Sequence, residues 1–207
     1  MNTPLKFLII FVALATGLLY SCDNSSQKLP ILGEREFING DSVYHTIPDF
    51  SFTDQNGLEI TNKTYENKIY IADFFFTTCP TICPVMKTQL LRVYDKFKAN
   101  PQVGILSHTI DPRHDSVAVL KEYAKRLGVE GDFWHFVTGK KDKIYELGQK
   151  FYYVTTGEDS TAAGGFIHSG AFILVDKKRR VRGMYDGTNE KEVDKLMKDM
   201  EILLAEQ

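Results

Sequence analysis

The feature that most constrains the fold is an apolar run from Lys68 to Phe76 that leads into two cysteines, Cys79 and Cys83. Its residues are nearly all aliphatic or aromatic, the pattern of a strand buried on both faces of a sheet. After the cysteines, apolar residues recur at helical spacing. Pro84 suits the first helical turn, because the N–H that proline lacks would have no partner there. We therefore expect a central strand, a short loop with two thiols, and a helix.

The first 22 residues indicate export. Lys6 supplies positive charge, and the mostly apolar run from Phe7 to Tyr20 is shorter than the roughly 20 apolar residues that a membrane helix needs. The run ends at Cys22 in a sequence that resembles the lipobox, in which the cysteine becomes the lipidated first residue. The prediction is a lipid-anchored protein of the bacterial cell envelope, with its domain on the non-cytoplasmic side. The alternative is an ordinary cleaved signal.

The cysteine count agrees with lipidation. The chain has three cysteines, and an odd thiol outside the cytoplasm needs an explanation. Lipidation of Cys22 leaves Cys79 and Cys83 as a pair. In an oxidising compartment that pair tends to become a disulfide unless a metal or a reductant intervenes.

Length and charge narrow the possibilities further. A chain of 207 residues fits one buried domain. Its 25 Lys and Arg nearly balance 27 Asp and Glu, without a long run of like charge, so no nucleic-acid partner is expected. We predict a signal peptide over residues 1–22, a tether over 23–40 that joins membrane and domain, and a folded domain over 41–207.

The remaining pattern alternates strands and helices before a closing antiparallel hairpin and helix, which favours an α/β fold with a mixed sheet flanked by helices. A cysteine pair between a central strand and a helix start is typical of the thioredoxin-like fold. The other expected segments are an N-terminal β-hairpin over 45–60, a strand over 103–110, a helix capped by Asp115 and ended by Gly128, a strand over 133–137, a helix over 141–151, a flexible loop over 157–165, a hairpin of 166–175 and 181–185, and a helix over 190–205.

Three residues separate the two cysteines, whereas two do so in thioredoxin-type redox sites. Residues four apart near a helix start share one face, where backbone N–H groups stabilise negative charge. Two such thiolates suit a soft cation, particularly Cu(I), but they also suit disulfide exchange. A histidine is the natural third copper ligand. Of the five histidines, His168 is best placed, where a glycine-rich loop meets a strand, although an isolated histidine is more often a packing residue.

At this point the chain resembles the Sco (SenC) copper proteins, which help to assemble the copper centre of subunit II in cytochrome c oxidase. The resemblance runs from about Pro48 to the C-terminus, and it is carried by four elements: Phe75–Pro84 with Met86, Asp111–Asp115, Trp134–Gly139, and His168. It implies that Cys79, Cys83 and His168 are copper ligands. It also implies that Asp111 lies near the metal-binding surface, with a role in orienting the loop or the partner, whereas its position before Pro112 is equally that of a simple turn former. The chain departs from the family pattern in having Ser169 directly after His168.

Two functions remain open. The first is a metallochaperone that delivers Cu(I) or Cu(II) to subunit II or to another cuproprotein, without enzymatic turnover. The second is a thiol–disulfide oxidoreductase that reduces partner cysteines, in which Cys79 and Cys83 form a disulfide when oxidised and a thioredoxin-like reductant restores them. A thiol peroxidase is a weaker third possibility, because the two cysteines look arranged for their sulfurs to converge.

Overall fold

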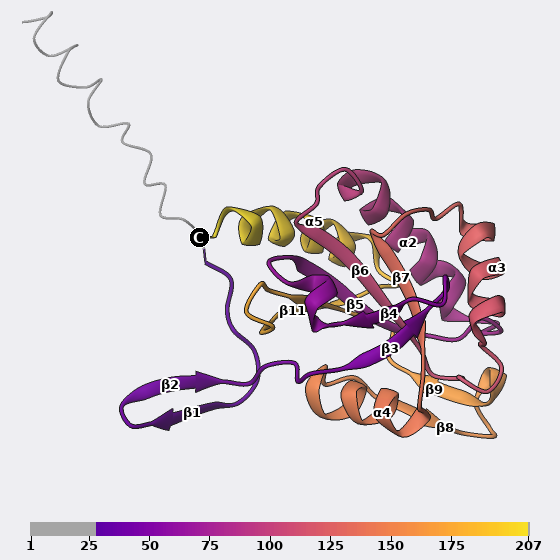
Figure 1. The fold of residues 1–207 in the computed structure, drawn as a ribbon, viewed down its shortest axis with the longest axis horizontal. Helices are drawn as coiled ribbons and strands as arrows, with labels where there is room; N and C mark the ends of the chain where they lie inside the picture. Colours follow the sequence, from indigo (N-terminus) through magenta and orange to yellow (C-terminus); the bar gives the residue numbers. More distant parts are fainter. Residues whose placement is uncertain (1–27, 207) are drawn as a thin grey trace, which may run out of the picture.

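A computed structural model describes residues 28–206, except for the side chains of Ala163 and His168. The main sheet is mixed and has seven strands, in the order β11-β10-β5-β6-β7-β3-β4. It lies between helices (Figure 1). The strands are β3 (Ser51–Asp54), β4 (Glu59–Thr61), β5 (Ile69–Phe75), β6 (Val103–Thr109), β7 (Trp134–Thr138), β10 (Ala171–Val175) and β11 (Val181–Asp186). Strands β5, β6 and β7 are parallel, and the others join antiparallel. The predicted thioredoxin-like α/β fold is confirmed, including the hairpin before the central strand.

Strand β5 is buried along its whole length because helices cover both faces of the sheet. On one face, Asp73 contacts Lys87 of helix α2. On the other face, Phe74 lies against Tyr152, just after α4 and its π-helical extension η2. In Figure 1, α2, α3 and α5 lie on one side of the sheet and α4 on the other. The helices are α2 (Ile82–Phe97), α3 (Val117–Leu127), α4 (Lys141–Glu146) with η2 (Leu147–Phe151), α5 (Glu190–Ala205), and the short 3₁₀ turns η1 (Asn62–Tyr65) and η3 (Ala163–Gly165).

Part of the predicted tether has a defined structure. Strands β1 (Arg35–Ile38) and β2 (Asp41–Tyr44) form a separate antiparallel hairpin that extends from the body of the molecule (Figure 1). Its turn holds Asn39 and Gly40 at positive φ, as a tight two-residue hairpin turn requires. Leu29 and Pro30 precede this hairpin in the chain, and their carbonyl oxygens accept hydrogen bonds from the buried side chain of Arg182. The chain is therefore fixed to the domain well before residue 41.

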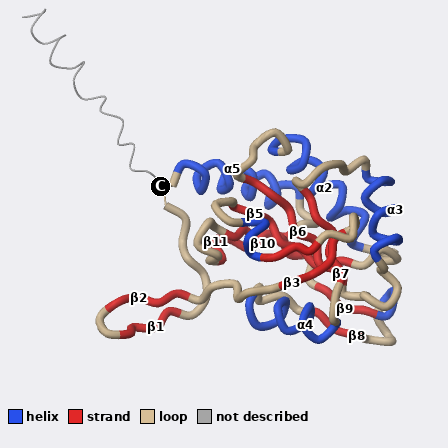
Figure 2. The backbone as a smooth tube through the Cα atoms, in the orientation of Figure 1, coloured by secondary structure: helices blue, strands red, loops and turns tan. Residues whose placement is uncertain are grey.

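The segment before β10 also differs from the prediction. The sequence predicts one strand over residues 166–175, but β9 (Phe166–His168) ends before Gly170 and pairs with β8 (Thr156–Glu158) in a sheet of two strands. Figure 2 shows this pair apart from the main sheet. The predicted flexible loop over 157–165 is thus closed at its base by strand pairing. An apolar run interrupted by His168, Ser169 and Gly170 does not reveal that its two halves join different sheets.

Helix α3 begins differently from the prediction. Ser116, not Asp115, is the N-cap, and its hydroxyl accepts from the N–H of Val119. Asp115 is fully buried and directs its carboxylate toward the cysteine loop. The predicted end of the helix at Gly128 is confirmed, since this residue adopts the left-handed conformation that glycine favours.

Candidate metal and thiol site

The two cysteines lie where the loop after β5 enters helix α2. Cys79 and Cys83 are both buried thiols, 8% and 2% exposed. The N–H of Cys79 donates to the Phe76 carbonyl at 3.2 Å, which closes the loop into a tight turn. The helix starts at Ile82, so Cys83 belongs to the first turn, where backbone N–H groups point outward without helical partners. Both sulfurs thus lie at the positive end of the helix, as the sequence predicts.

The two thiols differ in acidity. Burial raises the pKa of Cys79, but hydrogen bonds from the backbone N–H groups of Thr81 and Cys83, together with the Cys83 and Thr81 side chains, outweigh it, so the pKa lies below its ordinary value. The Thr81 hydroxyl lies 3.8 Å from the Cys79 sulfur. Burial raises the pKa of Cys83, and its contact with Cys79 adds to the rise. Cys79 is therefore the more reactive thiol and Cys83 the one that keeps its proton.

A buried ion pair lies beneath Cys83. Lys87, one helical turn further along α2, donates to Asp73 of β5 at 2.5 Å, and their side chains are 2% and 0% exposed. The Lys87 ammonium also donates to Ser107 at 3.2 Å and lies 4.2 Å from the centre of the Phe75 ring. Its charge lowers the pKa of Cys83, against the larger effect of burial. Sequence patterns alone do not single out this pair, although a carboxylate inside an apolar strand signals a buried partner.

Asp115 fixes the cysteine loop from the other side. Its carboxylate accepts from the N–H of Thr77 at 3.1 Å and from the Thr77 hydroxyl at 2.5 Å. The Thr109 hydroxyl, at the end of β6, donates to the same carboxylate. Thr77 precedes Cys79 by two residues, so a buried carboxylate joins the loop to the central sheet.

Asp111 forms the turn between β6 and α3. Its carbonyl oxygen accepts from the N–H groups of His114 and Asp115, and its own N–H donates to the Thr109 hydroxyl at 3.0 Å. Burial, followed by the charges of Glu158 and Asp111, raises the pKa of Tyr145 to about 12. Asp111 therefore shapes the turn, as composition predicts, while its place at a metal-binding surface stays a prediction.

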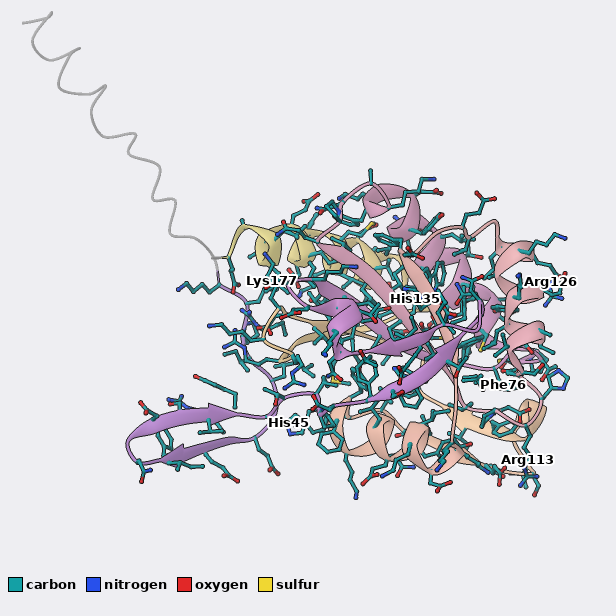
Figure 3. The ribbon with its side chains drawn as sticks, viewed as in Figure 1. His45, Phe76, Arg113, Arg126, His135 and Lys177 are labelled. Carbon is teal, nitrogen blue, oxygen red and sulfur yellow. The ribbon has the colours of Figure 1, made fainter. Side chains whose placement is uncertain are left out.

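The strand that ends at His168 packs on the cysteine loop. The Phe166 ring lies 5.0 Å from the Phe76 ring. A Cβ on Gly164 would come within 2.9 Å of Phe76 and 3.2 Å of Pro80, and a Cβ on Gly170 would lie 3.8 Å from Ile82, between the cysteines. Phe166 and Gly170, which lie on either side of His168 in the chain, are thus both close to the cysteine loop. Figure 3 shows Phe76 at the end of the molecule where β8, β9 and α3 meet.

The other histidines lie in different surroundings. His108 is buried among aromatic rings, and burial lowers its pKa to about 3. His135 is buried with its Nδ1 2.9 Å from Asp54, His45 packs on Phe151, and His114 is exposed in the turn. Among the side chains that the structure describes, no group of three His, Cys, Asp or Glu could hold a metal. That set leaves out the His168 side chain, so the predicted ligand set of Cys79, Cys83 and His168 stays a prediction.

The predicted lipidation site, Cys22, lies outside the described residues. Within residues 28–206, no helix has both the length and the apolar character needed to cross a bilayer. Lipidation of Cys22 therefore remains a prediction from the sequence.

Together, the fold and the site define a class of protein: a thioredoxin-like domain with two cysteines at a helix start and a histidine-bearing strand held against them. The family model of SCO1/SenC matches residues 39–205. The chain therefore belongs to the SCO1/SenC family.

Known proteins agree with this assignment. The SCO1 protein homolog of Bacillus subtilis (strain 168) is 30% identical over 166 residues, which cover 77% of this chain and 83% of that protein. The crystal structure of a SCO1/SenC family lipoprotein from Bacillus anthracis str. Ames has a TM-score of 0.71 at 25% identity, covering 77% of this chain and 95% of that one.

Two further structures bear on chemistry. BsSco, described as a member of the Sco family of cytochrome c oxidase assembly proteins with a disulfide switch, has a TM-score of 0.69 at 28% identity and covers 79% of this chain and 95% of that one. Yeast Sco1 with copper bound has a TM-score of 0.58 at 28% identity and covers 76% of this chain and 89% of that one.

Proposed function

We propose that this chain is an envelope copper metallochaperone that delivers copper to, or prepares, the copper centre of cytochrome c oxidase subunit II. The observation that carries the proposal is the packing of the His168 strand on the loop that presents Cys79 and Cys83. Two thiolates and an imidazole form a soft donor set that suits Cu(I). The copper-bound yeast Sco1 and the oxidase-assembly description of BsSco support the cargo and the partner.

The net charge of the proposed site depends on the oxidation state of the bound copper. Two thiolates and a neutral imidazole around Cu(I) carry a net charge of −1, whereas Cu(II) makes the site neutral. Because the cysteines are buried, this difference acts in a medium that screens charge poorly. Binding and release of copper are therefore coupled to its oxidation state, and oxidation of the empty pair to a disulfide abolishes metal binding.

The test is an anaerobic copper titration of the reduced protein, followed by its thiolate-to-copper charge-transfer absorption. We expect one copper per wild-type chain and much weaker binding by His168→Ala. His114→Ala is the matched control, since this exposed histidine lies in the turn before α3 and should leave binding unchanged. Equal, tight binding by wild type and His168→Ala would remove His168 from the site.

The acidity difference between the cysteines favours a second function, thiol–disulfide exchange. The Cys79 thiolate attacks a disulfide of the partner and forms a mixed disulfide, releasing one partner thiolate. Cys83, after losing its proton, attacks the Cys79 sulfur and releases the second. The partner gains two electrons and the Cys79–Cys83 pair loses two, so a thioredoxin-like reductant must restore it.

This second function has its own test. The reduced protein is mixed with an oxidised peptide that carries the copper-binding cysteines of subunit II, and the redox states of both are measured. Reduction of the peptide at a rate that depends on Cys79 would support exchange. Failure of the reduced wild-type protein to reduce the peptide, or a reduction potential of the Cys79–Cys83 pair above that of the peptide, would exclude it.

A further inference from the structure

The carboxylate of Asp115 joins the cysteine loop to the end of strand β6. The residue is fully buried. It accepts two hydrogen bonds from Thr77, through the N–H and the hydroxyl, and a third from the hydroxyl of Thr109. Its bonds to Thr77 span 38 positions of the chain, so they bear on the tertiary placement of the loop and not only on the turn that contains Asp115.

We propose that Asp115 is the positioning residue of the cysteine site, and that it sets the conformation from which Cys79 and Cys83 bind copper. This inference rests on the proposed copper function. The hydrogen bond between Cys79 and Phe76 lies within the segment between β5 and α2. The hydrogen bonds from Thr77 to Asp115 instead connect that segment to the turn before α3. A buried carboxylate bonded by N–H and O–H donors holds them more strongly than a neutral acceptor does.

The arrangement has a direct consequence for binding. Copper requires both sulfurs and the third ligand at fixed separations, so a loop that is already in place loses less conformational entropy on binding. The same carboxylate accepts a hydrogen bond from the Thr109 hydroxyl at the end of β6. That hydroxyl in turn accepts from the N–H of Asp111, in the turn that follows β6. Asp115 is also held by its own backbone, whose N–H donates to the Asp111 carbonyl at 2.9 Å, so its position does not depend on the Thr109 hydroxyl alone.

Two isosteric substitutions separate positioning from general support. Thr77→Val and Thr109→Val each remove one hydroxyl donor from the same carboxylate, but only the first lies on the cysteine loop. If Asp115 acts by positioning, Thr77→Val and Asp115→Asn loosen the loop, whereas Thr109→Val leaves it in place. Thr77→Ser keeps the donor and should restore the wild-type behaviour.

The first measurement is backbone hydrogen–deuterium exchange of the full-length, reduced, metal-free protein, resolved to the segment 76–81. We expect exchange in this segment to speed up by about tenfold to a hundredfold in Thr77→Val and Asp115→Asn, the loss expected for a charge-assisted hydrogen bond. Segments in β6 and α5 serve as internal references for global opening. Unchanged exchange of 76–81 in Thr77→Val, or equal loosening by Thr109→Val, would overturn the proposal, even if Asp115→Asn fails to fold.

The second measurement is Cu(I) affinity in competition with a chelator of known affinity, with the charge-transfer band of the Cu(II) form as a reporter of geometry. We expect affinity to fall by about tenfold in Thr77→Val and to remain within about twofold in Thr109→Val and Thr77→Ser. A loosened loop with wild-type affinity and an unshifted band would refute the functional role of Asp115. Absence of copper binding by the wild-type protein would instead refute the proposed function, and the exchange data would still report on loop positioning.

Discussion

Removing Lys87 should destabilise the protein far more than removing an exposed lysine of the same helix. The side chain is 2% exposed and its ammonium lies 2.5 Å from Asp73, which is fully buried. In Lys87→Met, the Asp73 carboxylate keeps its buried position but loses its counter-charge. Breaking a buried pair from one side costs about 3–5 kcal/mol, because the remaining charge is uncompensated. For a domain of this size, that loss lowers the melting temperature by roughly 10 °C.

The matched control is Lys96→Met. Lys96 also belongs to α2 and lies 2.7 Å from Glu201, but these side chains are 42% and 55% exposed. An exposed ion pair contributes about 0–1 kcal/mol, so the control should unfold close to the wild-type temperature. Equal melting temperatures for Lys87→Met and Lys96→Met would refute the reasoning about the buried charge.

A double variant makes the test sharper. In Asp73→Leu with Lys87→Met, both charges are gone and the cavity is filled by apolar atoms, which is often neutral. The hydroxyl of Ser107 loses its acceptor, at a cost of about 1 kcal/mol. We therefore expect the double variant to be more stable than either single one, as measured by urea unfolding of the reduced, metal-free protein. Additive losses in the double variant would show that the two residues act independently.

Three further predictions concern the loop and the helices. Gly164→Ala should weaken copper binding and lower the melting temperature, because φ is +83° and the new Cβ would meet Phe76; unchanged binding would contradict this. In the metal-free protein, alkylation followed by mass spectrometry should modify Cys79 at a pH below that of an ordinary thiol and Cys83 only at higher pH, since the thiolate reacts and the pKa is lowered in one and raised in the other. The opposite order would contradict the assignment. Ser116→Ala should cost about 1 kcal/mol of unfolding free energy through the lost cap, and no loss would mean that the cap contributes nothing.

Much of the fold could be predicted because the core elements carry strong local patterns. Strand β5 is apolar along its length and is buried throughout. Helix α2 buries Met86, Leu90, Tyr94 and Phe97, the stripe that helical spacing indicates. The order of these elements around the cysteines then leaves few topologies, since parallel strands need crossover helices.

The rest depends on contacts that local patterns do not contain. In the sequence, Asp115 has the residue type and the position of a helix cap, yet its carboxylate accepts hydrogen bonds from Thr77 in the cysteine loop. Lys87 looks like any charged residue of an amphipathic helix until Asp73 is placed beneath it. In both cases the partner is distant in the sequence, so a single chain gives only the weak signal of a polar residue in an apolar setting.

The two proposed functions make different demands on His168, and this difference separates them. Disulfide exchange uses the sulfurs one after the other, and the lowered pKa of Cys79 with the raised pKa of Cys83 suits that order. Copper needs both thiolates at once, so it must displace the proton that Cys83 retains, and a third donor helps to offset that cost. We therefore expect His168→Ala to lose copper binding while it still reduces a disulfide peptide at the wild-type rate. Loss of both activities would instead mean that His168 maintains the loop that both reactions share.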